Sequence, residues 1–442
     1  MVCKPVVLLF LSGLVSTTSA RSHSKRAAAP KSVFSHFIVG NSYNFDSNMW
    51  ASNIKLASSK SIDAFTLNLG PDVWQPERVK TAFDTAQQVA PNFKMSLSFD
   101  MTELPCGSAA DGQSLIDKFI SPIKAHPSRY LINSKMLVST FAGQWCTFGQ
   151  ANPSDGWKWF LAAAGTPIYF MPNFQIDVSE LASTWTWLDG YKLWNAWSLT
   201  QQDNNQWADD AWYMQHTRPG QGYLTMVSAW YFSHRPGSPN NRYYRGDNFM
   251  LTKRWKQLIQ NRNSLSYVEI GSWNDYGESH YIGPLTGSIP ANTLYVNSNA
   301  DHTAWADLMA YYAKWFKNGN PPAITKDKVY MWARPHPKDA GICNSDGIGA
   351  VPNANWADDL LFVSVFLKAP AQVSCTSGNN KSGTKTLNAG VNEFSLPLSS
   401  GRVSCLIKRN GATVISYKPT AFTYTTSPSV CSMNAWTGMK SG

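Results

Sequence analysis

The feature that most constrains the fold is a repeated alternation of strand-like and helix-like segments between residues 33 and 317. The strand-like segments are short apolar runs, and the segments between them carry apolar residues at helical spacing. The eight predicted strands cover residues 33–41, 64–70, 94–100, 135–141, 168–174, 191–196, 223–231 and 267–273. The predicted helices cover 47–58, 78–90, 114–125, 156–164 and 302–317, with a further helix around residues 251–258. Eight strands that alternate with helices predict an α/β fold, the (β/α)8 TIM barrel.

A doubly wound parallel sheet is the structural alternative for the same alternation. Such a sheet would carry a glycine-rich phosphate turn after its first strand. The sequence FIVGN at residues 37–41 does not supply that turn. The barrel is therefore the preferred interpretation.

The composition changes after about residue 333. Helical spacing stops, and short strand-like runs follow one another, separated by Gly, Asn and Ser. These runs cover residues 359–366, 371–375, 393–398, 403–409, 412–417 and 421–425. They predict a C-terminal antiparallel β-sandwich at residues 334–442, after a catalytic barrel at residues 27–333. Support of the barrel and carbohydrate binding both stay open as the role of this sandwich.

The N-terminus has the pattern of a secretory signal. Lys4 precedes an apolar run at residues 5–15, and small residues follow up to Ala20. We expect residues 1–20 to be a signal peptide and residues 21–26 a short propeptide that ends in Lys25-Arg26. No later apolar run is long enough to span a membrane. These features predict a secreted protein, located outside the cell or in a cell wall.

Seven cysteines are present, and Cys3 lies in the predicted signal. The remaining six allow up to three disulfides in a secreted chain. Cys106 and Cys146 both follow predicted strands of the first domain, so we expect them to pair. The other four can pair among themselves in three ways; they are Cys343, Cys375, Cys405 and Cys431. Asn380 begins an N-glycosylation sequon.

Charge and composition narrow the possible partners. Charged residues make up 15% of the chain and aromatic residues 13%, with 19 Trp, which is typical of a secreted protein that meets a neutral, hydroxyl-rich ligand. The formal net charge of +10 falls to about +6 without the four cations of residues 1–26. No run of Lys and Arg is interleaved with aromatic residues, so we expect no nucleic-acid partner. We expect a monomer, and the absence of CxxC spacing argues against a zinc site.

The candidate active site lies in the stretch YVEIGSWNDYGESHY at residues 267–281, the predicted last strand and the loop after it. Active sites of such barrels lie at the C-terminal ends of the strands. Asp275 and Glu278 stand three residues apart in this loop, and Gly277 permits a turn between them. Paired carboxylates carry out glycoside hydrolysis, because one protonates the leaving oxygen and the other acts on water or on the anomeric carbon. The alternative is a pair of turn and cap residues on a solvated loop.

Further candidate residues stand at or near the predicted strand ends. Substrate binding through aromatic rings is predicted for Trp197, Trp230, Trp273 and Tyr281. Contacts to sugar hydroxyls are predicted for His36, Asn41, Asn68, His234 and Asn274. Asp100 is the reserve candidate for either catalytic role, or for orienting the water. The alternatives are a core histidine at His36, a cap or turn at Asp100, and core positions for Trp197 and Trp230.

Five stretches carry a resemblance to a known family: VFSHFIVG at 33–40, IDAFTLNLG at 62–70, MSLSFD at 95–100, SWNDYGE at 272–278 and DLLFVSVF at 359–366. In these stretches the chain resembles the fungal α-1,3-glucanases, or mutanases, of glycoside hydrolase family 71, over nearly all of the mature chain. The resemblance implies a (β/α)8 barrel with a C-terminal β-sandwich. It also implies endo-type hydrolysis of α-1,3-glucan, a fungal wall polysaccharide, with inversion at the anomeric centre and without metal or cofactor. Asp275 and Glu278 match the catalytic pair of that family.

Our working hypothesis makes Glu278 the general acid and Asp275 the base that activates water. A general acid needs a raised pKa. Burial beside Tyr276 and Tyr281, and repulsion between the two carboxylates, would raise the pKa of Glu278. Inverting pairs stand roughly 6.5–9.5 Å apart and retaining pairs about 5 Å, and a turn that contains glycine leaves this separation open. A non-catalytic wall lectin and a glycosidase of another linkage are alternatives. A structural wall protein would show repeats, which this sequence lacks.

Overall fold

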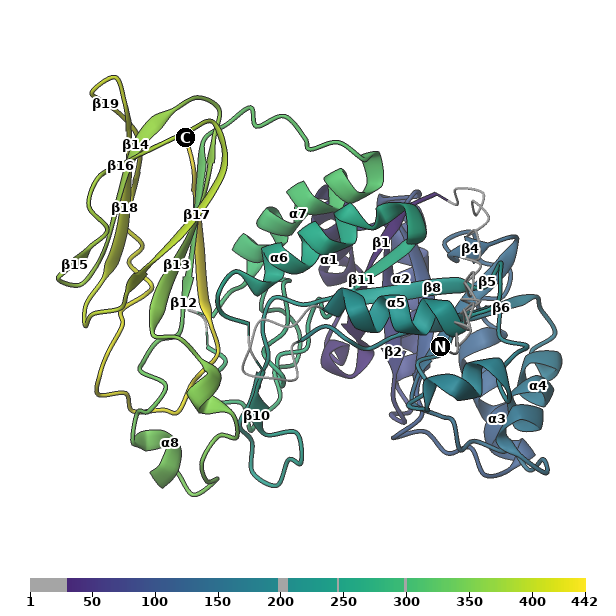
Figure 1. Ribbon diagram of the computed structural model, residues 1–442. Helices are drawn as coiled ribbons and strands as arrows, with labels where there is room; N and C mark the ends of the chain where they lie inside the picture. Colours follow the sequence, from purple (N-terminus) through teal and green to yellow (C-terminus); the bar gives the residue numbers. More distant parts are fainter. Residues whose placement is uncertain (1–29, 198–205, 245, 298–299) are drawn as a thin grey trace, which may run out of the picture.

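The computed structural model describes residues 30–197, 206–244, 246–297 and 300–442. Figure 1 shows two parts, a parallel sheet with its helices and a C-terminal part made of antiparallel sheets. The predicted signal and propeptide, residues 1–26, lie outside the described residues. Among the helices of the described ranges, none is both long and apolar enough to cross a membrane.

The first part is built on eight parallel strands, which follow one another along the chain as the sequence predicts. They are β1 (Ser32–Ile38), β2 (Ala64–Leu69), β3 (Lys94–Asp100), β5 (Lys135–Phe141), β6 (Ile168–Phe170), β7 (Gly190–Lys192), β8 (Gly222–Val227) and β11 (Tyr267–Ile270). Neighbouring strands pair in the order β6–β5–β3–β2–β1–β11–β8–β7, and β4 (Leu131–Ile132) pairs with β5 in the antiparallel sense. This is a mixed α/β fold in which every parallel pair needs a crossover connection.

The two ends of this sheet, β6 and β7, come together. The backbone N–H of Lys192 donates to the carbonyl of Pro172 at 3.0 Å, and the Asn173 side chain donates to the Lys192 carbonyl at 2.9 Å. Strand β6 ends at Phe170 instead of reaching residue 174, although the N–H groups of Met171 and Asn173 still donate to the carbonyls of Val138 and Thr140 in β5. The sheet is therefore curled, and single hydrogen bonds join its ends where a strand pair is missing.

Helices connect the strands and bury their apolar faces. They are α1 (Ser47–Ser59), α2 (Gln75–Val89), α3 (Ala109–Leu115), α4 (Pro153–Ala163), α5 (Gln206–His216), α6 (Met250–Gln260) and α7 (Thr303–Asn318). Side-chain caps begin several of them, as when Asp46 accepts a hydrogen bond from the N–H of Met49 at 2.8 Å. Trp50 of α1 packs on Phe37 of β1, with ring centroids 4.8 Å apart. Helix α5 was not predicted.

The C-terminal part consists of two antiparallel sheets. One contains β17 (Gly390–Pro397), β13 (Leu360–Leu367), β12 (Lys328–Ala333) and β20 (Trp436–Ser441), in that order. The other contains β15 (Asn380–Lys381), β14 (Ala371–Ser377), β18 (Val403–Arg409) and β19 (Ala412–Tyr417), with β16 (Lys385–Leu387) also on β14. Buried residues of both sheets, such as Val363 and Val373, belong to one hydrophobic cluster.

Two details differ from the predicted C-terminal boundaries. Strand β12 pairs with β13 and β20, so the chain enters these sheets before the predicted boundary at residue 333. The predicted strand at 421–425 forms only an isolated bridge between Tyr424 and Gly401. The predicted boundary follows the change of composition at about residue 333 and so places β12 in the barrel.

The six cysteines outside the first 26 residues form three disulfides. The predicted pair Cys106–Cys146 is present. The four remaining cysteines pair as Cys343–Cys431 and Cys375–Cys405. The latter pair joins β14 to β18, where the two residues are direct cross-strand partners. The former holds helix α8 (Ile342–Ser345) to the segment that precedes β20.

Buried side chains fasten the C-terminal part to the parallel sheet. Trp230, in the loop after β8, is fully buried, and its Nε1 donates to the carbonyl of Met433 at 2.7 Å. His302, beside the first residue of α7, has one ring nitrogen 2.8 Å from the Tyr281 carbonyl and the other 2.8 Å from the Ala435 carbonyl. Helices α6 and α7 lie between the two parts (Figure 1). The two parts therefore share an interior.

Replacing Trp230 by Ala should destabilise the whole protein. The change empties a large buried volume and leaves the Met433 carbonyl without its donor, a cost of about 3–5 kcal/mol. Urea unfolding followed by circular dichroism should give a lower midpoint. Trp212→Ala, which removes a ring of α5 that is 52% exposed, is the matched control. Equal midpoints for the two variants would contradict this account.

Candidate active site

The two candidate carboxylates lie in the loop after β11, and hydrogen bonds within the loop hold them. The Ser272 hydroxyl accepts from the N–H of Asp275 at 2.8 Å, and Asp275 Oδ1 accepts from the N–H of Glu278 at 3.0 Å. The Asn274 side chain bonds to both backbone groups of Ile38, accepting from N–H at 2.7 Å and donating to the carbonyl at 3.0 Å. The loop is therefore fixed to the C-terminal end of β1.

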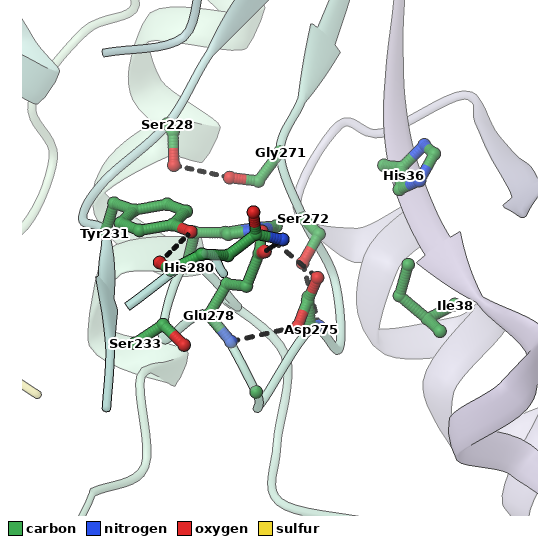
Figure 2. Close-up of polar contacts among 12 residues, drawn as sticks. His36, Ile38, Ser228, Tyr231, Ser233, Gly271, Ser272, Asp275, Glu278 and His280 are labelled. Carbon is green, nitrogen blue, oxygen red and sulfur yellow. Dashed lines mark hydrogen bonds and ion pairs between the residues drawn. The ribbon is translucent and has the colours of Figure 1, made fainter. Parts of the chain in front are cut away.

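His280 lies between the two carboxylates. Its Nε2 is 3.3 Å from Asp275 Oδ2 and 3.1 Å from Glu278 Oε2, and Figure 2 shows the three side chains converging. The ring is buried against Trp197, 5.1 Å between centroids, and against Tyr231 at 6.0 Å. Burial lowers the pKa of His280, but the Asp275 and Glu278 carboxylates outweigh it and raise the pKa to about 9. His280 is therefore a cation at neutral pH.

The environment keeps Asp275 ionised. Burial raises the pKa of this carboxyl, but the His280 cation, the Arg235 charge and the Glu278 N–H together lower it below its ordinary value. Oxygens of the Asp275 and Glu278 carboxylates lie within 4.8 Å of one another. Both side chains are about one-fifth exposed, so they reach solvent although His280 does not.

A second charged cluster lies inside the sheet. Glu269 of β11 is fully buried, with Oε1 3.0 Å from His36 Nδ1 and Oε2 2.6 Å from Lys192 Nζ. Burial raises the pKa of Glu269, but the Lys192 and His36 side chains bring it below its usual value. Burial, aided by the charge of Lys192, lowers the pKa of His36. Trp194 packs on this cluster, 5.1 Å from Lys192 Nζ to its ring centroid.

Three predicted residues, Asn41, Asn68 and Asp100, are partly exposed and also make polar contacts at the strand ends. Asn41 donates to the Asn274 carbonyl at 2.9 Å. Asn68 donates to Asp100 Oδ2 at 3.4 Å. Asp100 Oδ1 accepts from the hydroxyl of Thr102 at 2.6 Å, which is a turn contact. Asp100 therefore belongs to a separate pair at the ends of β2 and β3, and its observed contacts are those of the turn alternative.

The structure places three of the predicted substrate-binding residues, Trp230, Trp273 and Tyr281, in the interior. All three rings are enclosed by protein, with exposures of 0%. Nε1 of Trp273 donates to Asn53 at 2.8 Å, and Tyr281 stacks on His302 with centroids 3.9 Å apart. A ring with no exposed face cannot stack on a sugar. These side chains point behind the strand ends, into the core or toward the C-terminal part.

Three other predicted contacts are also buried. His234 is 2.7 Å from Asp346, in the segment after α8, and so points toward the C-terminal part. His36 lies in the charged cluster beneath the loop. Trp197 is 8% exposed, and its Nε1 donates to the carbonyl of Trp230 at 2.6 Å. Of the predicted aromatic residues, Trp197 alone touches the His280 ring.

Sequence reasoning missed residues that the structure places in or around the site. His280, Lys192 and Glu269 are charged residues within or next to apolar strands, and a buried charge in such a run is a usable signal. Partly or largely exposed aromatic rings also follow the strands, at Tyr43 (58% exposed), Trp74, Trp145 (49% exposed) and Trp194. Their positions directly after β1, β2, β5 and β7 place them at the C-terminal edge of the sheet.

The donor set of Asp275, Glu278 and His280 could hold a metal ion, since one ligand atom from each lies within 4.8 Å of the others. A metal would have to displace the proton that the raised pKa places on His280. A second group, His234, Asp346 and Cys431, is equally close, but Cys431 is bound in a disulfide. The arrangement of the first group suits acid–base chemistry.

A curled parallel sheet with an Asp/Glu pair on a loop at its C-terminal edge is the arrangement of a glycoside hydrolase. Residues 29–442 match the sequence model of glycosyl hydrolase family 71. The chain belongs to this family.

Three relatives are similar in sequence to the chain over most of its length. It is 35% identical over 442 residues to the glucan endo-1,3-alpha-glucosidase agn1 of Schizosaccharomyces pombe, with 98% of each chain covered. It is 30% identical to a mutanase of Penicillium rubens, covering 87% of this chain and 84% of that one. It is 29% identical to the ascus wall endo-1,3-alpha-glucanase of S. pombe, covering 82% and 84%.

Among solved structures, a mutant of β-glucuronidase 2 from Bacteroides uniformis has a TM-score of 0.50 with this chain. The match covers 90% of this chain and 45% of the other, at 10% identity. At this identity the likeness concerns the fold alone.

The raised pKa of His280 predicts a pH-dependent stability. Its folded pKa of about 9 lies above the ordinary value of 6.5. The stabilisation is therefore fully present below about pH 6.5 and is lost as the pH rises through about 9, an effect of up to about 3 kcal/mol. Thermal unfolding at pH 6, 7.5 and 9.5 should show a decline for the wild type that His280→Gln lacks. Parallel pH curves for both proteins would refute the assignment.

Proposed function

We propose that this protein is a secreted enzyme that cleaves α-1,3-glucosidic bonds within α-1,3-glucan. The observation that carries the proposal is the Asp275 and Glu278 pair, held around His280 at the C-terminal edge of the sheet, in a chain that matches its family from residue 29 to its end. The names of two relatives support the linkage, since one is a glucan endo-1,3-alpha-glucosidase and the other an endo-1,3-alpha-glucanase.

Other features support the remaining parts of this proposal. We take the curled sheet with its helices as a (β/α)8 barrel and the two C-terminal sheets as a β-sandwich that supports it. Endo-type action is consistent with exposed rings on several loops around the site, such as Tyr43 and Trp145, because internal cleavage requires contacts on both sides of the bond. Three disulfides and a relative named for the ascus wall favour a secreted protein.

The environment of Asp275 supports its proposed role as the base. Glu278 donates a proton to the glycosidic oxygen as that bond breaks, and Asp275 takes a proton from the water that attacks the anomeric carbon. The lowered pKa of Asp275 keeps it ionised and ready to accept a proton. Asn240 donates to Glu278 Oε1 at 3.2 Å and orients the acid. Net transfer leaves Glu278 ionised and Asp275 protonated, and exchange with solvent restores both.

The spacing of the pair bears on stereochemistry. Oxygens of the two carboxylates lie within 4.8 Å of one another, and both carboxylates contact the same nitrogen of His280. An inverting reaction needs a separation of roughly 6.5–9.5 Å to admit water. We infer that substrate entry moves one carboxylate away from His280 and opens this gap.

Removing either carboxylate should abolish most activity without unfolding the protein. Glu278→Gln and Asp275→Asn should each lower kcat on α-1,3-glucan by about 10²–10⁴-fold, the usual worth of acid–base catalysis. Reducing-end release measures the loss, and circular dichroism checks the fold. Asp100→Asn is the matched control and should retain most of its activity. A Glu278→Gln variant that keeps more than about a tenth of wild-type activity would exclude Glu278 as the acid.

The product of the first turnover distinguishes the proposed reaction from its alternatives. Proton NMR of the initial products from α-1,3-glucan should detect β-configured reducing ends, which inversion requires. Incubations with starch, β-1,3-glucan and cellulose should release no sugar. Initial α-configured ends would indicate that the close spacing is itself reactive and that one carboxylate is a nucleophile. Binding without release from any polymer would indicate a lectin.

A further inference from the structure

Two loops beside the loop at residues 271–281, which carries Asp275 and Glu278 and is called the catalytic loop below, line a polar cavity of about 320 Å³ that is open to solvent. One loop joins β9 (Phe232–Ser233) to β10 (Arg242–Tyr243) and contributes Arg235 and Ser238. The other follows the catalytic loop and contributes Pro290 and Asn292. The volume lies at the lower end of the range for small-molecule sites. The mechanism proposed above uses none of these side chains to bind substrate.

The walls of this cavity are fixed to the catalytic loop. The Tyr295 hydroxyl, on the second loop, donates to the carbonyl of Gly277 at 2.7 Å and accepts from the N–H of His234 at 3.4 Å. Asn241 holds both backbone groups of Arg235, at 2.7 and 2.6 Å. These bonds join the two walls to the segment that contains Asp275 and Glu278, so the cavity keeps a set position beside the carboxylates.

Arg235 has donors to spare. Its guanidinium makes only long contacts, at 3.4 Å, to the hydroxyls of Ser233 and Ser238, although it carries five N–H groups. Within the described ranges it forms no salt bridge. A Cβ placed on Gly277 would lie 3.1 Å from Arg235 Nη1 and 3.5 Å from Asp275 Oδ1. The bare Gly277 backbone therefore lets the guanidinium approach the catalytic carboxylate.

We propose that this cavity is a sugar subsite, which binds a glucosyl unit of the substrate next to the one being cleaved. Arg235, Ser238 and Asn292 supply hydrogen bonds to its hydroxyl groups, and the cavity takes a neutral pyranose. An anion would also suit a free guanidinium, but the neighbouring Asp275 and Glu278 carboxylates repel it. This inference rests on the proposed function and names the part of the glucan that one side of the site recognises.

The same guanidinium acts on the catalytic base. Its charge is one of the causes that lower the pKa of Asp275. Arg235 is therefore a binding residue for the sugar and a positioning residue for the charge state of Asp275. The substitution Arg235→Lys separates the two roles. Lys keeps the charge that acts on Asp275 but loses the planar set of donors that would bind the sugar.

The test uses soluble α-1,3-gluco-oligosaccharides of increasing length as substrates. It compares Arg235→Met, Arg235→Lys and a double variant that carries both Ser238→Ala and Asn292→Ala. Arg235→Met should raise KM by about tenfold, the worth of one hydrogen bond to a charged group, and move the acidic limb of kcat/KM to higher pH. Arg235→Lys should keep the wild-type pH limb with a raised KM. The Ser238/Asn292 double variant should raise KM severalfold and keep the wild-type acidic limb, because Arg235 is still present. Arg402→Met, an exposed site of the C-terminal part, is the control and should match the wild type.

A second measurement keeps the inference independent of catalysis. Calorimetric titration of the same oligosaccharides into Glu278→Gln protein should give an affinity that the added Ser238→Ala and Asn292→Ala changes weaken. Unchanged KM and affinity in these variants would overturn the subsite, even if Arg235→Met fails to fold. Competition by inorganic phosphate that disappears in Arg235→Met would identify an anion site and also overturn it. If the wild type releases no sugar from α-1,3-glucan, the proposed function fails, and the titration still decides whether the cavity binds the oligosaccharide.

Discussion

A buried ion pair between Lys192 and Glu269 is the interaction on which the arrangement of the parallel sheet depends. The Lys192 ammonium lies 2.6 Å from Glu269, and its backbone N–H joins β7 to the carbonyl of Pro172 beyond β6. One residue therefore closes the curled sheet and neutralises the carboxylate that holds His36. Loss of one partner would leave an uncompensated buried charge, which typically costs 3–5 kcal/mol. Charges in this interior are tolerated because each has a partner.

The loop that carries Asp275 and Glu278 has a similar pairing of opposite charges, but its carboxylates are partly exposed. His280 is enclosed and positive, and the two carboxylates that surround it reach solvent. The carboxylates raise the pKa of His280, and the His280 charge in turn favours the ionised form of Asp275. Substrate binding must exchange part of this pairing for contacts to sugar. On the loop between β9 and β10, Asn240 donates to Glu278 and the charge of Arg235 lowers the pKa of Asp275, so this loop acts on both carboxylates.

Much of the fold followed from periodicity, and the site followed only in part. All eight parallel strands lie where apolar runs were expected, and Asp275 and Glu278 stand on the loop after the last one. The errors concern side chains whose environment comes from distant segments. Trp230 donates a hydrogen bond to a carbonyl 203 residues further along the chain. Nothing near Trp230 in the sequence indicates that partner. Strand ends display side chains in several directions, and only packing selects the one that faces substrate.

The sequence by itself determined the class of fold, the family and the pair of carboxylates, because strand and helix periods, glycine turns and local motifs are encoded by neighbouring residues. Tertiary structure alone decided which charges meet. His36, Lys192 and Glu269 come from three strands. The pKa of His280 is raised by the two carboxylates that the loop places beside its ring. Electrostatic energies depend on distances of a few ångströms and on burial. Those quantities exist only once the sheet has curled and the C-terminal part has covered its loops.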